Sequence, residues 1–159
     1  MEAFVRPGPD PLNWGDRSNM MSSGVVQTGS AELSVYYSEH YRSPTCRLRR
    51  ATLRIDGFVS VNASYAGGEL TTKPLTFEGG ELVINYATSV AGSIRVEVQE
   101  ADGKAIDGHL LPQSADIFGD EIERVVAWDS GTDVSALAGR PVRLRFTMKD
   151  ADLYSIRFR

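Results

Sequence analysis

Two aspartates, Asp150 and Asp152, stand one residue apart near the end of the chain, in the stretch RLRFTMKDADLYSIRF. Aspartate is common in the turn between two strands, because its side chain bonds to nearby backbone amides. The same pair suits a structural calcium ion, which takes hard oxygen ligands, and catalysis is a third use of paired carboxylates. The apolar residues before and after the pair alternate as in strands. The turn is therefore the favoured interpretation, with calcium binding as the alternative.

A second group of carboxylates lies in FGDEIERVVAWD and comprises Asp120, Glu121, Glu123 and Asp129. Two carboxylates about 5–9 Å apart hydrolyse glycosidic bonds in most glycosidases. Neighbouring residues of a strand face opposite sides of the sheet, so Asp120 and Glu121 would not converge on one substrate. Glu121 and Glu123 share a face, as solvated strand residues often do. Solvent-exposed charges are the favoured interpretation, and metal or sugar ligands are the alternative.

Aromatic residues with a polar edge form a third group, because such rings stack on sugars while the edge bonds hydroxyl groups. Most of them are expected to pack in the core or on a sheet face. Trp14 is the exception, since it lies in the proline-rich stretch DPLNWGDR, where an aromatic side chain has less reason to be buried. The group consists of Trp14, Tyr36, Tyr37, Tyr41, Tyr65, Tyr86 and Trp128.

The remaining reactive residue types give weaker signals. His40 and His109 show no metal-ligand spacing, and the sequence contains no nucleophile elbow or phosphate-binding glycine loop. The single Cys46 excludes an internal disulfide and a cysteine-based zinc site. Because it lies in a strand-like run, Cys46 is expected to be a buried or half-buried, inert thiol. The arginines of RLRRATLR alternate with leucines and predict the wet face of a sheet rather than an anion groove.

Composition narrows the class of protein. The 159 residues are 42% hydrophobic and 24% charged, which is typical of one ordinary globular domain with a core or of one domain and an appended piece. The net charge of −4 disfavours a nucleic-acid partner, since phosphate binding needs a basic face. No apolar run approaches the roughly 20 residues that span a bilayer, so no membrane partner is expected. The start, MEAFVRPGPDP, has no apolar signal core, and the localisation stays open.

The elements that must position these residues are strands. The first twenty or so residues are rich in proline and glycine and predict an irregular segment. Runs over 24–28, 32–41 and 46–61, with a turn at Asp56-Gly57, predict an antiparallel meander. Asp133 and Gly139 predict one short helical turn. Further strand-like runs follow over 70–87, 93–106, 122–128, 141–149 and 153–158, with turns at 78–80 and 102–103.

The sequence therefore predicts an all-β fold of about ten short strands. We expect an antiparallel β-sandwich, jelly-roll or lectin-like, preceded by the irregular N-terminal segment and the meander. A seam is expected near residues 63–68, which divides the chain into residues 1–64 and 65–159.

Several long stretches resemble the ends of bacterial glycosidase-like proteins. They include FVRPGPDPLNWGDR, GVVQTGSAELSVYYSEHY, LRRATLRIDGFVSVNASYAGGEL and IFGDEIERVVAWDSGTDVSALAGRPVRLRFTMKDADLYSIRF. Together they resemble the glycosyl hydrolase family 32 proteins and related sialidase-like proteins, in which a five-bladed β-propeller precedes a β-sandwich. The resemblance implies that residues 1–64 match the last propeller stretch and residues 65–159 the trailing sandwich.

The resemblance also sets the functional expectations. The acidic catalytic residues of that family come from the early propeller blades, and nothing in this sequence matches their motifs. We therefore expect no catalytic residue here, and a non-catalytic module that binds an oligosaccharide or polysaccharide or acts as a scaffold. By resemblance, Asp10, Asn13, Trp14 and Arg17 lie near the mouth of the propeller and are the candidate sugar ligands. A purely structural or oligomerisation domain is the alternative, and a glycosidase with activity of its own is a third hypothesis.

An uncovered propeller blade leaves sheet edges and an apolar face exposed. A second copy of the chain, or a propeller domain, is therefore an expected partner. No cofactor is expected apart from the structural calcium at Asp150 and Asp152.

Overall fold

The computed structural model describes residues 4–15 and 17–159. The chain divides after Gly57 into two compact units, Met1–Gly57 and Phe58–Arg159. Strand β4 (Val61–Ala63) pairs with β8 (Val142–Phe158), so it belongs to the sheet of the second unit. The boundary expected between residues 64 and 65 therefore lies inside the second unit, and the division falls at the Asp56-Gly57 turn instead.

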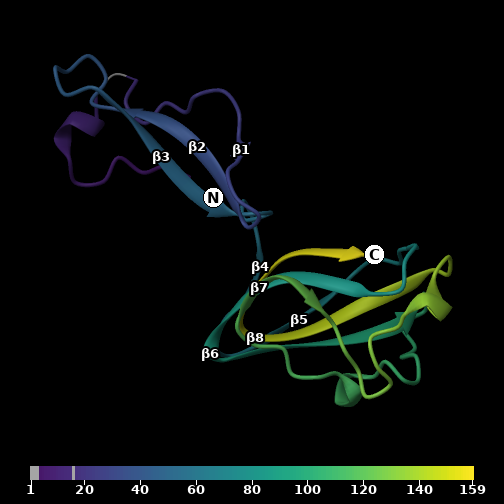
Figure 1. Ribbon diagram of the computed structural model, residues 1–159. Helices are drawn as coiled ribbons and strands as arrows, with labels where there is room; N and C mark the ends of the chain where they lie inside the picture. The colour runs from purple at the N-terminus through teal and green to yellow at the C-terminus, as the bar shows by residue number, and fades with distance from the viewer. Residues whose placement is uncertain (1–3, 16) are drawn as a thin grey trace. The chain divides into compact units, whose positions relative to one another are not determined.

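The first unit is the predicted antiparallel meander, and its three strands follow the order β1–β2–β3 (Figure 1). The proline-rich residues that precede the strands contain the short 3-10 helix η1 (Pro11–Asn13), with Pro11 in its first turn. The chain leaves β3 through a turn in which Asp56 has a positive φ of 60°. The strands are β1 (Val26–Gln27), β2 (Glu32–Glu39) and β3 (Arg47–Arg54).

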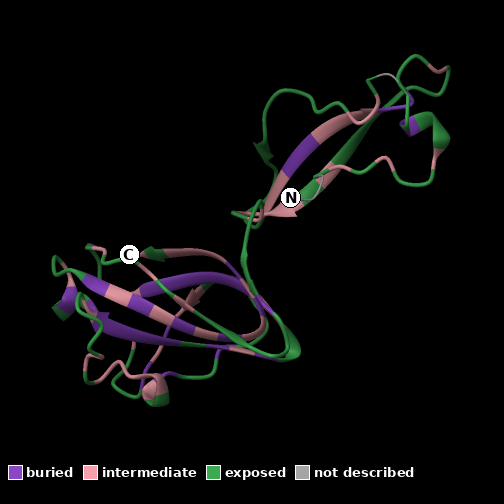
Figure 2. Cartoon of the chain, turned by 180° about the vertical axis from the view of Figure 1, so that it is seen from behind, coloured by how far each residue is buried: buried purple, intermediate pink, exposed green. Residues whose placement is uncertain are grey.

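The first unit has very little hydrophobic core. Among its described residues, Val35 is the one hydrophobic side chain that is buried, whereas twenty are buried in the second unit. Figure 2 shows the contrast, with a short buried stretch on β2, longer buried stretches on β6 and buried residues that alternate with half-buried ones on β8. Ser34, Glu39 and His40 are also buried in the first unit, so polar contacts contribute much of its internal packing.

The second unit is built on two long antiparallel strands, β6 (Leu82–Glu100) and β8, which run side by side over most of their length (Figure 1). The sheet order is β4–β8–β6–β7, and β5 (Gly68–Thr71) also pairs with β8. Strand β7 (Asp120–Val125) lies at the far edge, and the short 3-10 helices η2 (Leu111–Gln113) and η3 (Ser135–Leu137) lie in the connections.

Both long strands are bent by irregular pairing. The register of β6 against β8 shifts between Thr88 and Ser93, and Asp150 on the facing strand has a positive φ of 44°. Residues 89–92 of β6 and Asp150 of β8 have no register partner, and such unpaired residues bend a strand and change which side chains face inward. Met148 and Ala151 are both buried on either side of Asp150, although strict alternation would place them on opposite faces. The bulge therefore keeps both halves of β8 directed at one core.

This core is formed by inward residues of β6 and β8 and by the connections that cover them. Trp128 is buried and donates its indole N–H to the Val96 carbonyl at 2.8 Å. Phe77 stacks on Phe158 with ring centroids 3.8 Å apart, which attaches the end of β8 to the connection between β5 and β6. The predicted all-β, sandwich-like fold is confirmed.

Several local predictions are confirmed as well. Asp133 accepts the amide hydrogen of Ser135 at 2.8 Å at the start of the single helical turn, η3, and Gly139 has a positive φ of 74°. The turn at Asp102-Gly103 closes with a bond from Gly103 N–H to the Glu100 carbonyl.

Two predictions were wrong. Asp150 and Asp152 do not lie in a turn between strands, because β8 continues through both and the bulge replaces the turn. Cys46 is exposed rather than buried or half-buried, because it closes a turn before β3, where its N–H bonds the Ser43 carbonyl at 3.0 Å.

Candidate functional site

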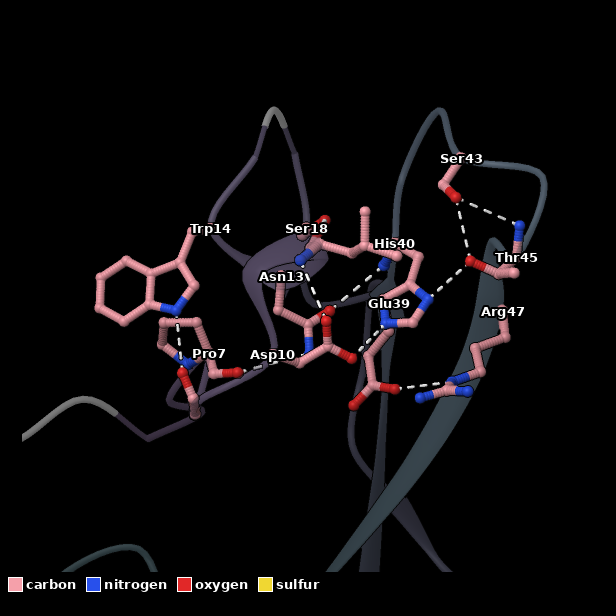
Figure 3. A network of polar contacts seen from close by, with 12 residues as sticks. Pro7, Asp10, Asn13, Trp14, Ser18, Glu39, His40, Ser43, Thr45 and Arg47 are labelled. Carbon is pink, nitrogen blue, oxygen red and sulfur yellow. Dashed lines mark hydrogen bonds and ion pairs between the residues drawn. The ribbon is translucent and has the colours of Figure 1, made fainter.

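Polar side chains of the first unit meet where the proline-rich segment contacts the end of β2 (Figure 3). Asp10 begins η1 and accepts the Leu12 amide hydrogen through Oδ1 at 3.0 Å. Its other oxygen, Oδ2, lies 2.8 Å from Nε2 of His40, thirty positions along the chain. His40 has a positive φ of 54°, and its side chain is only 7% exposed. The carboxylate thus fixes a segment without regular pairing to the end of a strand.

Asn13 completes this attachment. Its Oδ1 accepts the backbone N–H of His40 at 3.3 Å, and its Nδ2 donates to the Pro7 carbonyl at 3.4 Å. Asn19 Nδ2 donates to the Asn13 carbonyl at 2.9 Å. Asn13 is buried, so its side chain serves the internal structure of the unit.

The second ring nitrogen of His40, Nδ1, lies 2.8 Å from Thr45 Oγ1. An ionised carboxylate only accepts hydrogen bonds, so the contact with Asp10 requires a proton on Nε2; a ring with its one proton there would accept from the Thr45 hydroxyl through Nδ1. The Asp10 carboxylate, the His40 imidazole and the Thr45 hydroxyl are therefore connected in the same order as in hydrolases that activate a hydroxyl nucleophile.

Acyl transfer also needs hydrogen-bond donors that face the developing oxyanion. Around Thr45 the nearby amides are engaged in the turn: Thr45 N–H bonds Ser43 Oγ at 3.3 Å, and Cys46 N–H bonds the Ser43 carbonyl. Ser43 Oγ also lies 3.0 Å from Thr45 Oγ1. We therefore interpret the Asp10–His40–Thr45 array as a structural clasp.

A second carboxylate of the clasp region is shared by arginines. Glu39, buried at the end of β2, accepts Arg47 Nε at 2.8 Å and lies 3.7 Å from Arg49 Nε. The Arg47 hydrogen bond is the main reason that the pKa of Glu39 lies below its ordinary value. The pKa of Asp10 is also lowered, first by the Leu12 amide and then by His40. Both groups are anions near neutral pH.

Trp14 has a different environment from the clasp. Its side chain is 72% exposed, and its indole N–H donates to the Gly8 carbonyl at 2.8 Å. In Figure 3 the indole lies beside Pro7 and away from the His40 ring. A single hydrogen bond thus orients the indole while most of its surface faces solvent, as expected from its proline-rich surroundings.

Arg17, the fourth candidate sugar ligand, has a positive φ of 56°. Its guanidinium carbon lies 6.0 Å from the Tyr41 ring centroid, and that of Arg42 lies at the same distance. Cations at this distance from an aromatic face are attracted by the ring quadrupole. Of the four candidates, the structure brings Asp10 and Asn13 together at His40, leaves Trp14 exposed and places Arg17 near Tyr41.

The paired aspartates of the second unit have separate roles in the structure. Oδ1 of Asp152 accepts Ser60 Oγ at 2.7 Å and Asn62 Nδ2 at 3.0 Å, which connects β8 with the segment around β4. Asp150 forms the bulge, and its N–H donates to the Ser64 carbonyl at 3.0 Å. Within the described part of the chain, no three His, Cys, Asp or Glu side chains are grouped to hold a metal ion. Calcium binding at Asp150 and Asp152 stays a prediction.

The acidic residues of β7 contact arginines. Glu121 accepts from Arg124 at 3.3 Å and from the Tyr86 hydroxyl at 3.2 Å. Glu123 Oε1 lies 2.5 Å from Arg157 Nη2. These ion pairs agree with the interpretation of the β7 carboxylates as surface charges.

One concave feature of the second unit is apolar. A pocket of about 170 Å³ lies along β8, lined chiefly by Val61, Leu70, Phe146, Leu153 and Ile156. Such a lining suits hydrocarbon rather than hydroxyl-rich ligands.

Sequence reasoning did not find the clasp. Asp10 before Pro11 marks the start of a helical turn, but its partner His40 is distant in the sequence, and nothing local to either residue indicates the pairing.

Comparison with known proteins gives no assignment: no family model, no curated protein and no solved structure matches the chain. Among the described residues, no helix has both the length and the hydropathy needed to cross a membrane.

Proposed function

We propose that the protein is a non-catalytic, carbohydrate-associated module of a glycoside-hydrolase-like protein, which binds an oligosaccharide or polysaccharide through Trp14. The observation that carries this proposal is the exposed, oriented indole, since aromatic faces of this kind stack on sugar rings. The sequence resemblance to glycosyl hydrolase family 32 and sialidase-like propeller proteins motivates the choice of ligand.

The surroundings of Trp14 support a rigid binding surface. The clasp contact of Asp10 with His40 and the hydrogen bond from His40 N–H to Asn13 hold η1, the turn from which the indole projects. A preorganised platform loses less conformational entropy on binding than a mobile side chain. Asp10 keeps 40% of its side chain exposed, so it can accept bonds from sugar hydroxyls at the edge of the same segment.

Isothermal titration calorimetry with plant and algal oligosaccharides tests the proposal. We expect binding by the wild-type chain, loss of binding by Trp14→Ala and retention by Trp14→Phe, which keeps an aromatic face. Tyr65→Ala is the matched control, because Tyr65 is an exposed aromatic residue of the second unit. If the wild type binds none of the glycans, or Trp14→Ala binds as well as the wild type, the proposal fails.

A structural or oligomerisation domain is the second candidate. The first unit buries one hydrophobic side chain among its described residues, while nine of its large hydrophobic side chains are exposed. Exposed apolar surface of this extent is typical of proteins that pack against a partner. Calorimetry separates this role from sugar binding, since a purely structural domain binds no glycan whether or not it associates.

A further inference from the structure

The two sheets end in edge strands of different length and opposite charge. In the first unit, β3 closes the order β1–β2–β3 and is eight residues long. In the second unit, β7 closes the order β4–β8–β6–β7 and is six residues long. The other edge strands, β1, β4 and β5, have two, three and four residues. Long edges are the ones that accept a further strand from another chain, although the pairing of β7 with β6 shifts register between Ile84 and Tyr86.

The backbone register shows which groups of β3 face outward. Ile55 N–H donates to the Ala31 carbonyl at 3.2 Å, toward β2. Backbone groups alternate in direction along an antiparallel strand, so the odd-numbered residues of β3 face β2. The even-numbered ones, including Thr52, therefore direct their N–H and C=O groups away from β2.

The same reasoning applies to β7. Val126 N–H donates to the Leu82 carbonyl at 2.9 Å, toward β6. Val125, the preceding residue, pairs with Val83 and therefore directs its N–H away from β6. Each unit thus presents an outward N–H with which another strand can pair, although the next outward carbonyl after Val125, that of Ala127, already accepts the Ala115 N–H at 3.0 Å.

Charge decides which edges match. Strand β3 carries four arginines and no carboxylate, although Glu39 and Glu32 of the neighbouring β2 pair with three of these arginines. Strand β7 carries three carboxylates and one arginine, and two of the carboxylates pair with Arg124 and Arg157. The net charges of the two units differ in the same direction. Residues 1–57 contain seven basic and six acidic residues, which gives +1, and residues 58–159 contain ten basic and fifteen acidic residues, which gives −5. The two values add up to the net charge of −4 of the chain.

Pairing of β3 with its own copy is disfavoured. In an antiparallel pair centred between Arg50 and Ala51, Arg47 would stand opposite Arg54 of the second copy, and like charges directly opposite are destabilising. Cationic edges of this kind commonly prevent self-pairing. An acidic strand is the better match.

We propose that β3 of one chain pairs edge to edge with β7 of a second copy, so that copies associate head to tail. The main-chain hydrogen bonds supply affinity, and the opposite charges select the partner edge. Because the contact joins two different surfaces, an open assembly keeps one unpaired β3 at one end and one unpaired β7 at the other. Assemblies of more copies, or a closed ring, therefore form at higher concentration. The association does not depend on sugar binding at Trp14.

Sedimentation velocity over a range of concentrations tests the proposal. The wild-type chain is expected to associate reversibly, and less strongly at high salt. Thr52→Pro removes an outward N–H of β3 without changing charge, and Val125→Pro does the same for β7. Each proline variant alone is expected to sediment as a monomer. Thr52→Val and Val125→Ile keep the N–H groups and are expected to associate as the wild type does.

The decisive sample is an equimolar mixture of the two proline variants. The Thr52→Pro chain keeps an intact β7, and the Val125→Pro chain keeps an intact β3, so the mixture should form a 1:1 dimer and nothing larger. A monomeric wild type, a Thr52→Pro chain that still associates, or a Val125→Pro chain that dimerises by itself would each overturn the proposal.

A charge variant keeps the test decisive if a proline variant fails to fold. Arg49→Glu leaves the backbone of β3 unchanged, and the Arg49 side chain is about half exposed. Association should weaken about two- to fivefold, as expected for the loss of one cross-strand ion pair. Unchanged association of a folded Arg49→Glu chain would contradict the pairing with β7.

Discussion

Gly92 lies against the main chain of Asp150 so closely that a Cβ on residue 92 would stand 2.4 Å from the Asp150 carbonyl oxygen. The same Cβ would stand 2.8 Å from the Lys149 carbonyl oxygen. The bends of β6 and β8 meet at this contact, which only glycine permits without movement of the main chain.

Gly92→Ala should therefore destabilise the second unit. The backbone must shift to admit a methyl group, at a cost of about 1–3 kcal/mol, which is typical of overpacking. The free energy of unfolding in urea measures the effect. Gly68→Ala is the matched control, because the nearest atom to its added Cβ is the Ala63 Cβ at 3.8 Å, an ordinary contact. Equal stability of Gly92→Ala and the wild type would contradict the close approach.

The clasp should loosen in acid. The pKa of Asp10 in the folded chain lies below its ordinary value of 3.8, because the ionised carboxylate accepts bonds from Leu12 and His40. A lowered carboxyl pKa gives stability that is present above the unfolded pKa and is lost as the pH falls through the folded one. Hydrogen exchange at the Leu12 amide reports this, and its protection should decrease below about pH 3.8.

Asp10→Asn is the control for this pH dependence. Asparagine keeps an acceptor for the Leu12 amide but does not ionise, so the pH-dependent part of the Leu12 protection should disappear. Protection that falls with pH in both chains alike would assign the effect to another group.

Tyr86 should ionise late in an alkaline titration. Burial, and then the neighbouring Glu121 carboxylate, raise the pKa of its hydroxyl to about 12. The hydroxyl donates to the Phe118 carbonyl at 2.8 Å, and only the neutral phenol can do so. This contribution to stability is present below the ordinary pKa of 10 and is lost as the pH rises through about 12.

Ultraviolet absorbance of tyrosinate follows this step. Tyr86→Phe should remove the latest-ionising component and cost about 0.5–1.5 kcal/mol, because the hydrogen bond to the Phe118 carbonyl is lost. If the late component persists in Tyr86→Phe, another tyrosine is responsible.

The two units should differ in their ability to fold alone. Twenty buried hydrophobic side chains lie in the second unit and one among the described residues of the first. Small sheets without a packed face are marginal in water. A fragment of residues 58–159 should unfold cooperatively in urea, and a fragment of residues 1–57 should unfold at a lower urea concentration. A 1–57 fragment at least as stable as the 58–159 fragment would contradict this assignment of stability.

Local patterns predicted the strands well where alternation and turn residues agree. Leu33, Val35 and Tyr37 alternate along β2, and Asp56-Gly57 forms a turn as expected, although this turn ends the meander instead of lying within it. Alternation failed at Asp150, because a bulge keeps a strand continuous while it shifts the inward face by one residue. Without knowledge of the facing strand, a bulge of this kind reads as a turn.

The site was predicted only in part for a related reason. The exposure of Trp14 follows from its proline-rich neighbours, which are local. The contact of Asp10 with His40 depends on how the proline-rich segment, which has no regular strand pairing, packs against the end of β2. His40 also adopts a positive φ, which its residue type does not predict. Long-range polar contacts of this type need the fold before they can be identified.

Sugar binding at Trp14 is tested most directly by the indole N–H signals of the two tryptophans in a nitrogen–proton NMR spectrum. Trp14 is exposed and Trp128 is buried, so the two signals report the candidate site and the core of the second unit separately. Titration with oligosaccharides should shift the Trp14 signal and leave that of Trp128 in place. A Trp14 signal that stays fixed throughout the titration would contradict the account.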